Sequence, residues 1–185
     1  MSARLFVALE LAADVRAQLA EFGREAAGHD NALRPVAEEA LHLTLAFLGH
    51  RALDEVDPAR EAVRGVARVA PQLALGGALW LAPRRPNVLT IALQDADGTL
   101  AALHAEVVER LAGLLPWEPD KRAFRPHVTV ARVRGGWRPR VGDLADAPQA
   151  TFAAPAVVLF RSHLGGRNPA RYEALERVAL EPPAQ

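Results

Sequence analysis

The sequence predicts an α+β fold, and two observations carry the prediction. Short apolar runs bounded by turn residues are typical of strands, and three longer segments repeat their apolar residues at helical spacing. The strands and helices do not alternate strictly along the chain, as they would in a parallel α/β sheet. An α+β class is therefore expected, in one globule with two lobes over residues 1–185.

The first half of the chain predicts two strands and two helices. "RLFVALEL" is a strand, and "AADVRAQLAEFGREA" follows with Val15, Leu19 and Phe22 on one helical face. Leu41 to Leu48 alternates for most of its length and predicts a strand. Residues 54–69 predict a helix, since Pro58 is tolerated in its first turn.

The second half predicts five strands and one helix, for a total of seven strands and three helices. "QLALGGALWL" and "NVLTIAL" form a hairpin through "APRRP". Asp97 caps a helix that runs to about Leu115. A strand begins at His127, and "TFAAPAVVLFRSHL" and "RYEALERVAL" are strands separated by the turn "GGRNPA". Each half thus contains a helix followed by a His-x-Thr strand, which indicates a weak internal duplication.

Composition excludes several classes of protein. Basic and acidic residues balance at 22 each, so no global charge attracts nucleic acid or a membrane. The absence of cysteine excludes disulfides and thiolate metal sites. No apolar run approaches the roughly 20 residues that span a bilayer, and the N-terminus does not resemble a signal peptide. We expect a cytoplasmic protein without a membrane partner.

One stretch departs from this charge balance. Between Lys121 and Arg140 there are seven basic residues and no acidic ones. A local stripe of this kind can attract an anionic ligand, although a solvated loop face would show the same pattern.

Two matching segments each carry a histidine and a threonine two residues apart: "HLTLAFLG" at 42–49 and "HVTVARVR" at 127–134. Residues i and i+2 of a strand point to the same face. Each strand should therefore bury one face and present an imidazole beside a hydroxyl on the other. The presented sets are His42, Thr44 and Ala46, and His127, Thr129 and Ala131. The buried sets are Leu41, Leu43, Leu45 and Phe47, and Val128, Val130 and Val133.

This pairing suits acid–base chemistry on a phosphodiester. An imidazole moves protons near neutral pH, and two of them can act as one neutral base and one protonated acid. Two threonine hydroxyls and a guanidinium can hold a phosphoryl group between them. Arg125 has the same parity as His127 and could contribute that guanidinium. The arrangement needs no metal ion and no cofactor.

The other histidines offer an alternative that stays open. A zinc site made of histidines could recruit several of the six in the chain, although no His-x-His or HExxH spacing occurs. His29, His50 and His104 are interpreted as surface or capping residues in loops or helices. His163, near a strand end, is expected to be structural or to line a ligand site.

Together these residues resemble the two HxTx signatures of the two-histidine (2H) phosphoesterase superfamily. They are most similar to its LigT/ThpR branch, the RNA 2′,3′-cyclic phosphodiesterases once described as 2′-5′ RNA ligases. The resemblance extends to "RLFVALEL", to "LRPVAEEALHLTLAFLG" and to "LFRSHLGGRNPARYEAL", and so covers nearly the whole chain. One departure is Ala40, where asparagine is common.

The resemblance implies a bilobal, pseudo-twofold fold in which two antiparallel-rich sheets flank a central cleft, with helices outside. It implies hydrolysis of the 2′,3′-cyclic phosphate at an RNA end to a 2′-phosphomonoester, without metal. His42 would be the proton donor and His127 the proton acceptor, and Thr44 and Thr129 would hold phosphate oxygens. Substrate-binding residues would be Arg132, Arg125, Arg34 and, as a lining or structural residue, Tyr172.

The partners implied are RNA ends that bear a 2′,3′-cyclic phosphate, with tRNA fragments as one candidate, and a monomer is the default. Three rivals stay open. The substrate could be another cyclic phosphate, such as a cyclic nucleotide or ADP-ribose 1″,2″-cyclic phosphate. The enzyme could run in reverse and join RNA ends through a 2′-5′ linkage, or the chain could be an RNA-binding module without catalysis.

Overall fold

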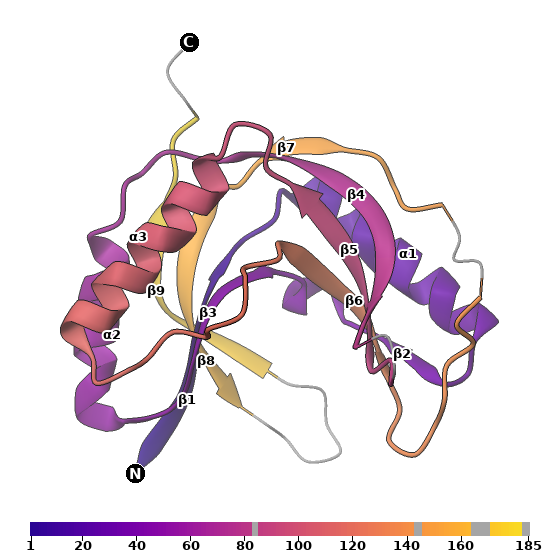
Figure 1. Ribbon diagram of the computed structural model, residues 1–185, viewed down its shortest axis with the longest axis horizontal. Helices are drawn as coiled ribbons and strands as arrows, with labels where there is room; N and C mark the ends of the chain where they lie inside the picture. The colour runs from indigo at the N-terminus through magenta and orange to yellow at the C-terminus, as the bar shows by residue number, and fades with distance from the viewer. Residues whose placement is uncertain (83–84, 143–145, 164–170, 183–185) are drawn as a thin grey trace.

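The computed structural model describes residues 1–82, 85–142, 146–163 and 171–182. Within these residues it contains nine strands, all paired antiparallel in one curved sheet (Figure 1). The strands are β1 (Ser2–Leu9), β2 (Leu33–Pro35), β3 (Leu43–Ala52), β4 (Gln72–Leu81), β5 (Val88–Gln94), β6 (His127–Val133), β7 (Thr151–Ala153), β8 (Ala156–His163) and β9 (Arg171–Ala179). Their order is β7-β4-β5-β6-β3-β1-β8-β9, with β2 beside β6.

The sheet consists of two halves that meet in its middle, at β6 and β3. One half holds β4, β5, β6 and β7, and the other holds β1, β3, β8 and β9. The join is narrow, because the register of β3 with β6 consists of the single pair Leu43 and Val128. The two antiparallel-rich sheets that the resemblance implies are joined through this pair into one continuous sheet of the described strands.

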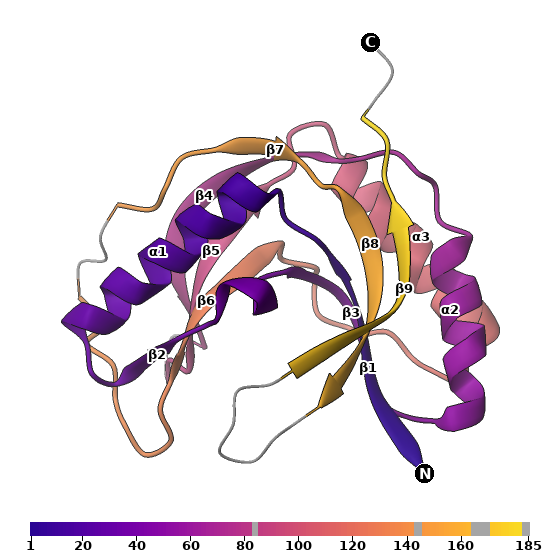
Figure 2. The ribbon, with the colours of Figure 1, turned by 180° about the vertical axis from the view of Figure 1, so that it is seen from behind.

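Each half is covered on its outer side by helices. The helices are α1 (Ala13–His29), α2 (Val56–Arg64) and α3 (Thr99–Leu114), with short 3₁₀ turns η1 (Glu38–Ala40) and η2 (Leu53–Glu55). Figures 1 and 2 show α1 across the half that contains β6, and α2 with α3 beside the half that contains β8 and β9. We call the face of the central strands that points away from the helices the inner face.

Helix α1 approaches β6 unusually closely. A Cβ placed on Gly23 would lie 2.6 Å from the backbone oxygen of Val130, so only glycine fits there. Val128 and Val130 are fully buried, and Val130 meets α1. Since alternate residues point to opposite faces, this contact turns His127 and Thr129 away from the helix, onto the inner face.

The predicted α+β class is confirmed, but the predicted tally of seven strands is wrong, since the described residues form nine. The sequence pattern missed the three-residue strand β2, and Pro155 divides the expected strand at 151–164 into β7 and β8. The helix expected over 54–69 is shorter, because a 3₁₀ turn precedes α2 and Gly65 ends it. The turn predicted at 165–170 lies outside the described residues, as does part of that at 82–86.

Two carboxylates receive the first amides of α3. The N-cap of α3 is Gly98 rather than the predicted Asp97. Asp97 nevertheless accepts from the Thr99 N–H, and Asp95 accepts from Leu100 and Ala101. Across the described segments, none of the helices has the length and apolar character needed to cross a membrane.

Candidate active site

The two His-x-Thr motifs lie side by side where the halves of the sheet meet. Leu43 of β3 and Val128 of β6 are register partners in an antiparallel pair. Continuing that register by one residue in each direction sets His42 beside Thr129, and Thr44 beside His127. Leu43 and Val128 are fully buried, whereas the four motif side chains are only partly buried on the inner face.

This register determines how far apart the functional groups stand. Residues directly opposite in an antiparallel pair have their Cβ atoms about 5 Å apart, and diagonal neighbours are about 7–8 Å apart. His42 and His127 are diagonal neighbours, and so are Thr44 and Thr129. The four Cβ atoms are therefore expected at the corners of a rectangle, with the histidines at one pair of opposite corners.

Both motif strands contain the same irregularity after the threonine. In the register of β1 with β3 the first residue left over after Thr44 is Leu45, and a second one, Leu48, follows further along; in the register of β5 with β6 the residue left over is Val130. Leu45 and Val130 are each the fourth residue of their motif, and each marks a β-bulge, which reverses the alternation of faces beyond it. Burial along 42–47 and along 127–132 consequently follows the same sequence of partly buried, buried and exposed residues.

The matched bulges correct the faces predicted from strict alternation. Ala46 and Ala131 are buried at 6% and 0% exposure, rather than presented beside the histidines. Phe47, predicted to be buried, is 63% exposed. It lies on the inner face, because its register partner Phe6 contacts the ring of His42. The faces predicted from strict alternation were wrong beyond the bulge. The bulge adds one residue to the strand, and because that residue is apolar the sequence pattern does not reveal it.

The bulge also brings Arg132 to the inner face. Five residues after His127, it would point the other way in an uninterrupted strand. Its positive charge instead lies near enough to His42 to lower the pKa of that imidazole. Arg34 of β2 is the register partner of Arg132. Two guanidinium groups directly opposite each other repel, and an anion between them would relieve that repulsion.

The two histidines are oriented in the same way by their own backbones. His42 Nδ1 donates to the carbonyl of Ala40 at 2.8 Å, and His127 Nδ1 donates to that of Arg125 at 2.6 Å. A carbonyl can only accept, so Nδ1 carries the hydrogen and Nε2 is left for a ligand. Pro126 favours an extended Arg125, the conformation that points this carbonyl at the ring.

His42 stands among aromatic rings from the half of the sheet that carries it. Its ring centroid lies 4.9 Å from that of Phe6, 6.3 Å from Phe160 and 5.3 Å from Tyr172, the last edge-on. Burial is the main cause that lowers the pKa of His42, from 6.5 to about 4; the hydrogen bond to the Ala40 carbonyl opposes this shift, and the charges of Arg132 and His127 add to it. Unliganded His42 is therefore a neutral imidazole at pH 7.

Tyr172 also borders a hollow in the β8–β9 hairpin. The hollow has a volume of about 440 Å³ and is lined in addition by His163, Arg171 and Glu173. His163 Nε2 lies 2.9 Å from a carboxylate oxygen of Glu173, so it takes part in an ion pair when protonated. His163 thus has both properties anticipated for it, a structural contact and a place beside a surface hollow.

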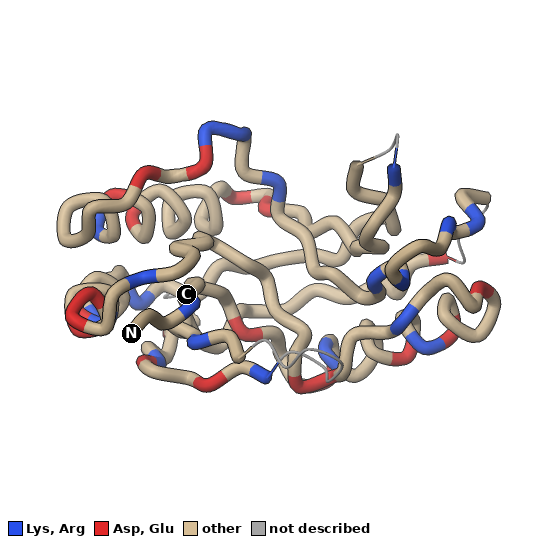
Figure 3. Tube along the Cα trace, turned by 90° about the horizontal axis from the view of Figure 1, so that it is seen from below, with Lys and Arg blue, Asp and Glu red and all other residues tan. Residues whose placement is uncertain are grey.

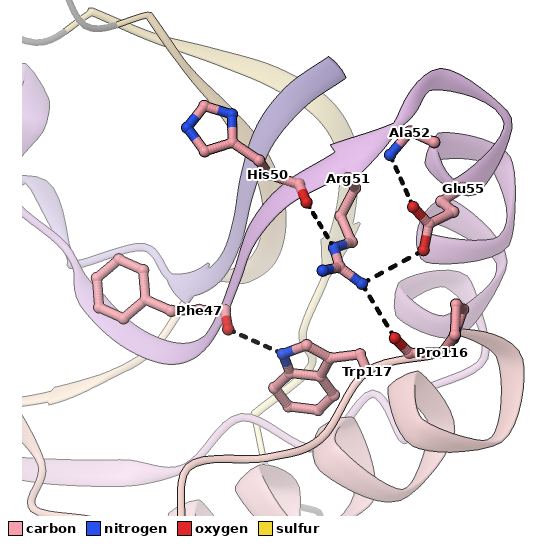
Figure 4. A network of polar contacts seen from close by, with 7 residues as sticks. All are labelled: Phe47, His50, Arg51, Ala52, Glu55, Pro116 and Trp117. Atoms are coloured by element: carbon pink, nitrogen blue, oxygen red, sulfur yellow. Dashed lines mark hydrogen bonds and ion pairs between the residues drawn. The ribbon is translucent and has the colours of Figure 1, made fainter. Parts of the chain in front are cut away.

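The free side of β3 is held by side chains rather than by a strand. The Trp117 indole donates to the carbonyl of Phe47 at 3.0 Å (Figure 4). Arg51 bridges from β3 to the Pro116 carbonyl at 3.1 Å and to Glu55 at 3.4 Å. His104 stacks on Phe124 at 3.8 Å between ring centroids. These contacts connect β3 to the segment that leads into His127.

The structure brings together most of the residues expected at the site. His42, His127, Thr44, Thr129, Arg132 and Tyr172 gather around the join of the halves, and Arg34 lies opposite Arg132. Arg125 contributes its backbone carbonyl, while its side chain is exposed. Among the described residues no group of three or more His, Cys, Asp or Glu side chains could hold a metal ion.

Sequence reasoning missed Phe6 and Phe160 beside His42, and it misplaced His50. Aligning "HLTLAF" with "HVTVAR" would have set Phe47 against Arg132 and so indicated an inner-face aromatic. His50 lies in β3, not in a loop or helix, and is exposed. His104 lies in α3, as expected, and is partly buried against Phe124.

A curved antiparallel sheet of two halves, each with an HxTx motif at the strand where it meets the other half, is the arrangement of the 2H phosphoesterase fold. Residues 10–166 match the family model of the 2′-5′ RNA ligase superfamily. The structure superposes on the crystal structure of Escherichia coli LigT complexed with 3′-AMP with a TM-score of 0.81 and 25% identity, covering 97% of this chain and 99% of LigT. The chain belongs to the 2′-5′ RNA ligase superfamily.

Two curated relatives differ in how much of their length the chain spans. An RNA 2′,3′-cyclic phosphodiesterase of Thermus thermophilus is 33% identical over 186 residues, which cover 96% of this chain and 90% of that protein. One from Geobacillus stearothermophilus is 29% identical over 181 residues, which cover 95% of this chain. The chain spans only 56% of the length of that second relative.

Proposed function

We propose that the protein is a metal-independent phosphodiesterase that opens the terminal 2′,3′-cyclic phosphate of RNA to a 2′-phosphomonoester. The observation that carries the proposal is the pairing of Leu43 with Val128, since continuing this register by one residue sets two equally oriented imidazoles at diagonal positions on the inner face. The substrate class is taken from the relatives named RNA 2′,3′-cyclic phosphodiesterase and from LigT, which was crystallised with 3′-AMP.

In the proposed reaction, water attacks phosphorus in line with the bond to O3′. Nε2 of His127 takes the proton from that water as the new P–O bond forms. The P–O3′ bond breaks, its electron pair goes to O3′, and Nε2–H of His42 gives O3′ a proton. Thr44, Thr129 and Arg132 stabilise the charge that develops on the nonbridging oxygens.

The donor role of His42 requires the substrate. Burial keeps this imidazole neutral in the free protein. A bound phosphate places a negative charge between the rings, which favours the imidazolium form and raises the pKa of His42. The negative charge of the bound ligand would thus favour protonation of His42, which makes it a proton donor. Because one histidine must be protonated and the other neutral, the rate should follow a bell-shaped dependence on pH.

The reaction should use the chain as one two-lobed unit over residues 1–185, because each half supplies one histidine. Arg34, Arg125 and Tyr172 are proposed to contact the substrate around the phosphate. A monomer and a cytoplasmic location stay predictions from the sequence. Joining of RNA ends through a 2′-5′ linkage would use the same ring-opening step, with the 5′-hydroxyl of a second RNA attacking phosphorus in place of water and O3′ again leaving with the proton from His42.

The deciding experiment is incubation with an oligoribonucleotide that ends in a 2′,3′-cyclic phosphate, in excess EDTA. Phosphorus NMR of the product should show a 2′-phosphomonoester. A 3′-phosphate would overturn the roles given to the histidines, and loss of activity in EDTA would overturn the metal-independent mechanism. Binding of RNA without turnover would leave only the RNA-binding alternative. Parallel reactions with a 2′,3′-cyclic mononucleotide and with ADP-ribose 1″,2″-cyclic phosphate distinguish the other substrate classes.

A further inference from the structure

The basic stripe of the sequence is divided by the fold, and one part of it continues outward from the candidate site. Arg122 forms an ion pair with Asp120 in the segment before β6. Arg132, Arg134, Arg138 and Arg140 instead follow β6 and its outgoing loop, in the half of the sheet that α1 covers. Figure 3 shows several Lys and Arg segments on this half, at the right of the view.

The outgoing loop, residues 134–140, is held at both ends by hydrogen bonds to residues 30–32. The Arg134 N–H donates to the Ala32 carbonyl at 2.8 Å, and its Nε donates to the Asn31 carbonyl at 3.1 Å. At the far end of the loop the Arg140 N–H donates to the Asp30 carboxylate at 2.7 Å. The loop is therefore an ordered feature of the surface.

A tight turn within this loop presents an indole to solvent. The Trp137 N–H donates to the Arg134 carbonyl at 3.0 Å, and Gly136 supplies the positive φ of 80° that the turn requires. Trp137 is 57% exposed, although tryptophan is highly buried on average. Three arginines, at 134, 138 and 140, lie within three residues of it along the chain.

An exposed aromatic ring among cations suits one kind of ligand. Proteins that bind single-stranded nucleic acid combine basic grooves, which follow the phosphates, with aromatic side chains on which unpaired bases stack. A double helix would not offer its bases to an indole at the surface. The loop is also continuous with the site, since two residues of strand place Arg134 about 7 Å beyond Arg132.

We propose that Trp137, with Arg134, Arg138 and Arg140, forms a second binding surface for the unpaired nucleotides next to the one that carries the cyclic phosphate. Trp137 stacks on a base, and the arginines contact phosphates. This inference rests on the proposed function, because it assumes that the candidate site receives an RNA end. It makes a single-stranded oligonucleotide a better substrate than a mononucleotide.

The test compares hydrolysis of a 2′,3′-cyclic mononucleotide with that of a single-stranded hexanucleotide ending in the same group. Trp137→Ala should raise KM for the hexanucleotide by at least about fivefold, the lower range for loss of one base stack. The mononucleotide should be affected much less, and kcat for both should change little. Trp137→Phe, which keeps a ring for stacking, should restore most of the loss.

A salt series tests the arginines. The logarithm of KM for the hexanucleotide should rise with the logarithm of salt concentration, and Arg138→Ala should reduce that slope by about 0.7, as expected for one phosphate contact on a single strand. The matched control is Arg68→Ala, which removes one exposed positive charge from the half covered by α2 and should leave the slope unchanged.

Two outcomes would overturn the proposal: equal losses on the mononucleotide and the hexanucleotide, or no loss on either. Thermal unfolding of each variant identifies a folding defect. If wild-type protein hydrolyses neither substrate, the proposed function fails, and fluorescence anisotropy of a labelled hexanucleotide still tests the surface. Weaker binding by Trp137→Ala would then support the surface without the enzyme, and unchanged binding would refute it.

Discussion

The segments 42–47 and 127–132, which lead into β3 and β6, match in their first five positions and differ at the sixth. Each presents a histidine and a threonine on the inner face, buries an alanine after a bulge, and orients its imidazole through a backbone carbonyl two residues earlier. The sixth position is Phe47 in one and Arg132 in the other. The duplication therefore supplies two proton-transfer groups, and the divergence supplies two different environments.

The divergence continues in the surroundings of each strand. Around His42 the neighbours are the rings of Phe6, Phe160 and Tyr172, which disfavour a positive charge on the imidazole. Around His127 the neighbouring strand β2 brings Arg34 opposite Arg132. One half of the site is therefore lined by aromatic rings and the other by arginines. A ligand that carries both an aromatic nucleobase and a phosphate would meet a complementary surface on each side.

The largest effect should come from removing either histidine. His42→Ala and His127→Ala should each lower kcat for cyclic-phosphate hydrolysis by about 10²–10⁴-fold, since each removes one general acid or base. His50→Ala is the matched control, because His50 is an exposed histidine of β3, the strand that begins directly after His42. Turnover near the wild-type rate in either active-site variant, with circular dichroism showing an intact fold, would refute the shared mechanism.

The matched sequence explains how much could be predicted from the chain alone. The class of fold, the two motif strands and their four polar residues follow from a pattern of alternation and from the repeat. The partnership of Leu43 with Val128 does not, because strand order depends on long-range packing. The bulges at Leu45 and Val130 are also invisible to alternation, and they decide that Phe47 and Arg132 reach the inner face.

Substitution at the sixth position should sharpen the comparison. Arg132→Ala should lower kcat/KM by about 10–100-fold, the cost of one charge-assisted hydrogen bond to phosphate. Because that contact is electrostatic, the ratio to wild type should shrink as salt is raised. Phe47→Ala should give a smaller loss that does not depend on salt. Steady-state kinetics at two ionic strengths measure kcat/KM of both variants. The same salt dependence in the two variants would contradict a charged role for Arg132 and an apolar role for Phe47.

The aromatic surroundings of His42 should also make the free energy of unfolding depend on pH. The pKa of His42 is about 4 in the folded protein and near 6.5 when unfolded. Between pH 4 and pH 6.5 the unfolded chain binds a proton at His42 that the folded protein does not bind. The contribution of His42 to the free energy of unfolding is therefore complete above pH 6.5 and is lost as the pH falls toward 4. The loss should be about 2–3 kcal/mol.

Urea unfolding of wild type and His42→Phe at several pH values isolates this contribution. The free energy of unfolding of wild type should fall more steeply between pH 6.5 and pH 4.5 than that of the variant. The slopes are compared rather than the absolute stabilities, because the substitution also removes the contact with Ala40. Parallel slopes would show that the aromatic rings do not hold His42 neutral.

The smallest effect concerns how the two strands complete their free edges. Beyond the bulge, β6 pairs with β2, whereas the Phe47 carbonyl on β3 accepts from the Trp117 indole. Trp117→Phe keeps an aromatic ring but removes this donor, and it should lower the free energy of unfolding by about 1 kcal/mol. The matched control is Trp80→Phe, since Nε1 of Trp80 is buried without a hydrogen-bond partner among the described residues. Removing that unpaired donor should cost nothing or should stabilise the protein. Equal destabilisation by the two substitutions in urea unfolding would mean that ring size matters at these positions, and not the hydrogen bond that completes the edge of β3.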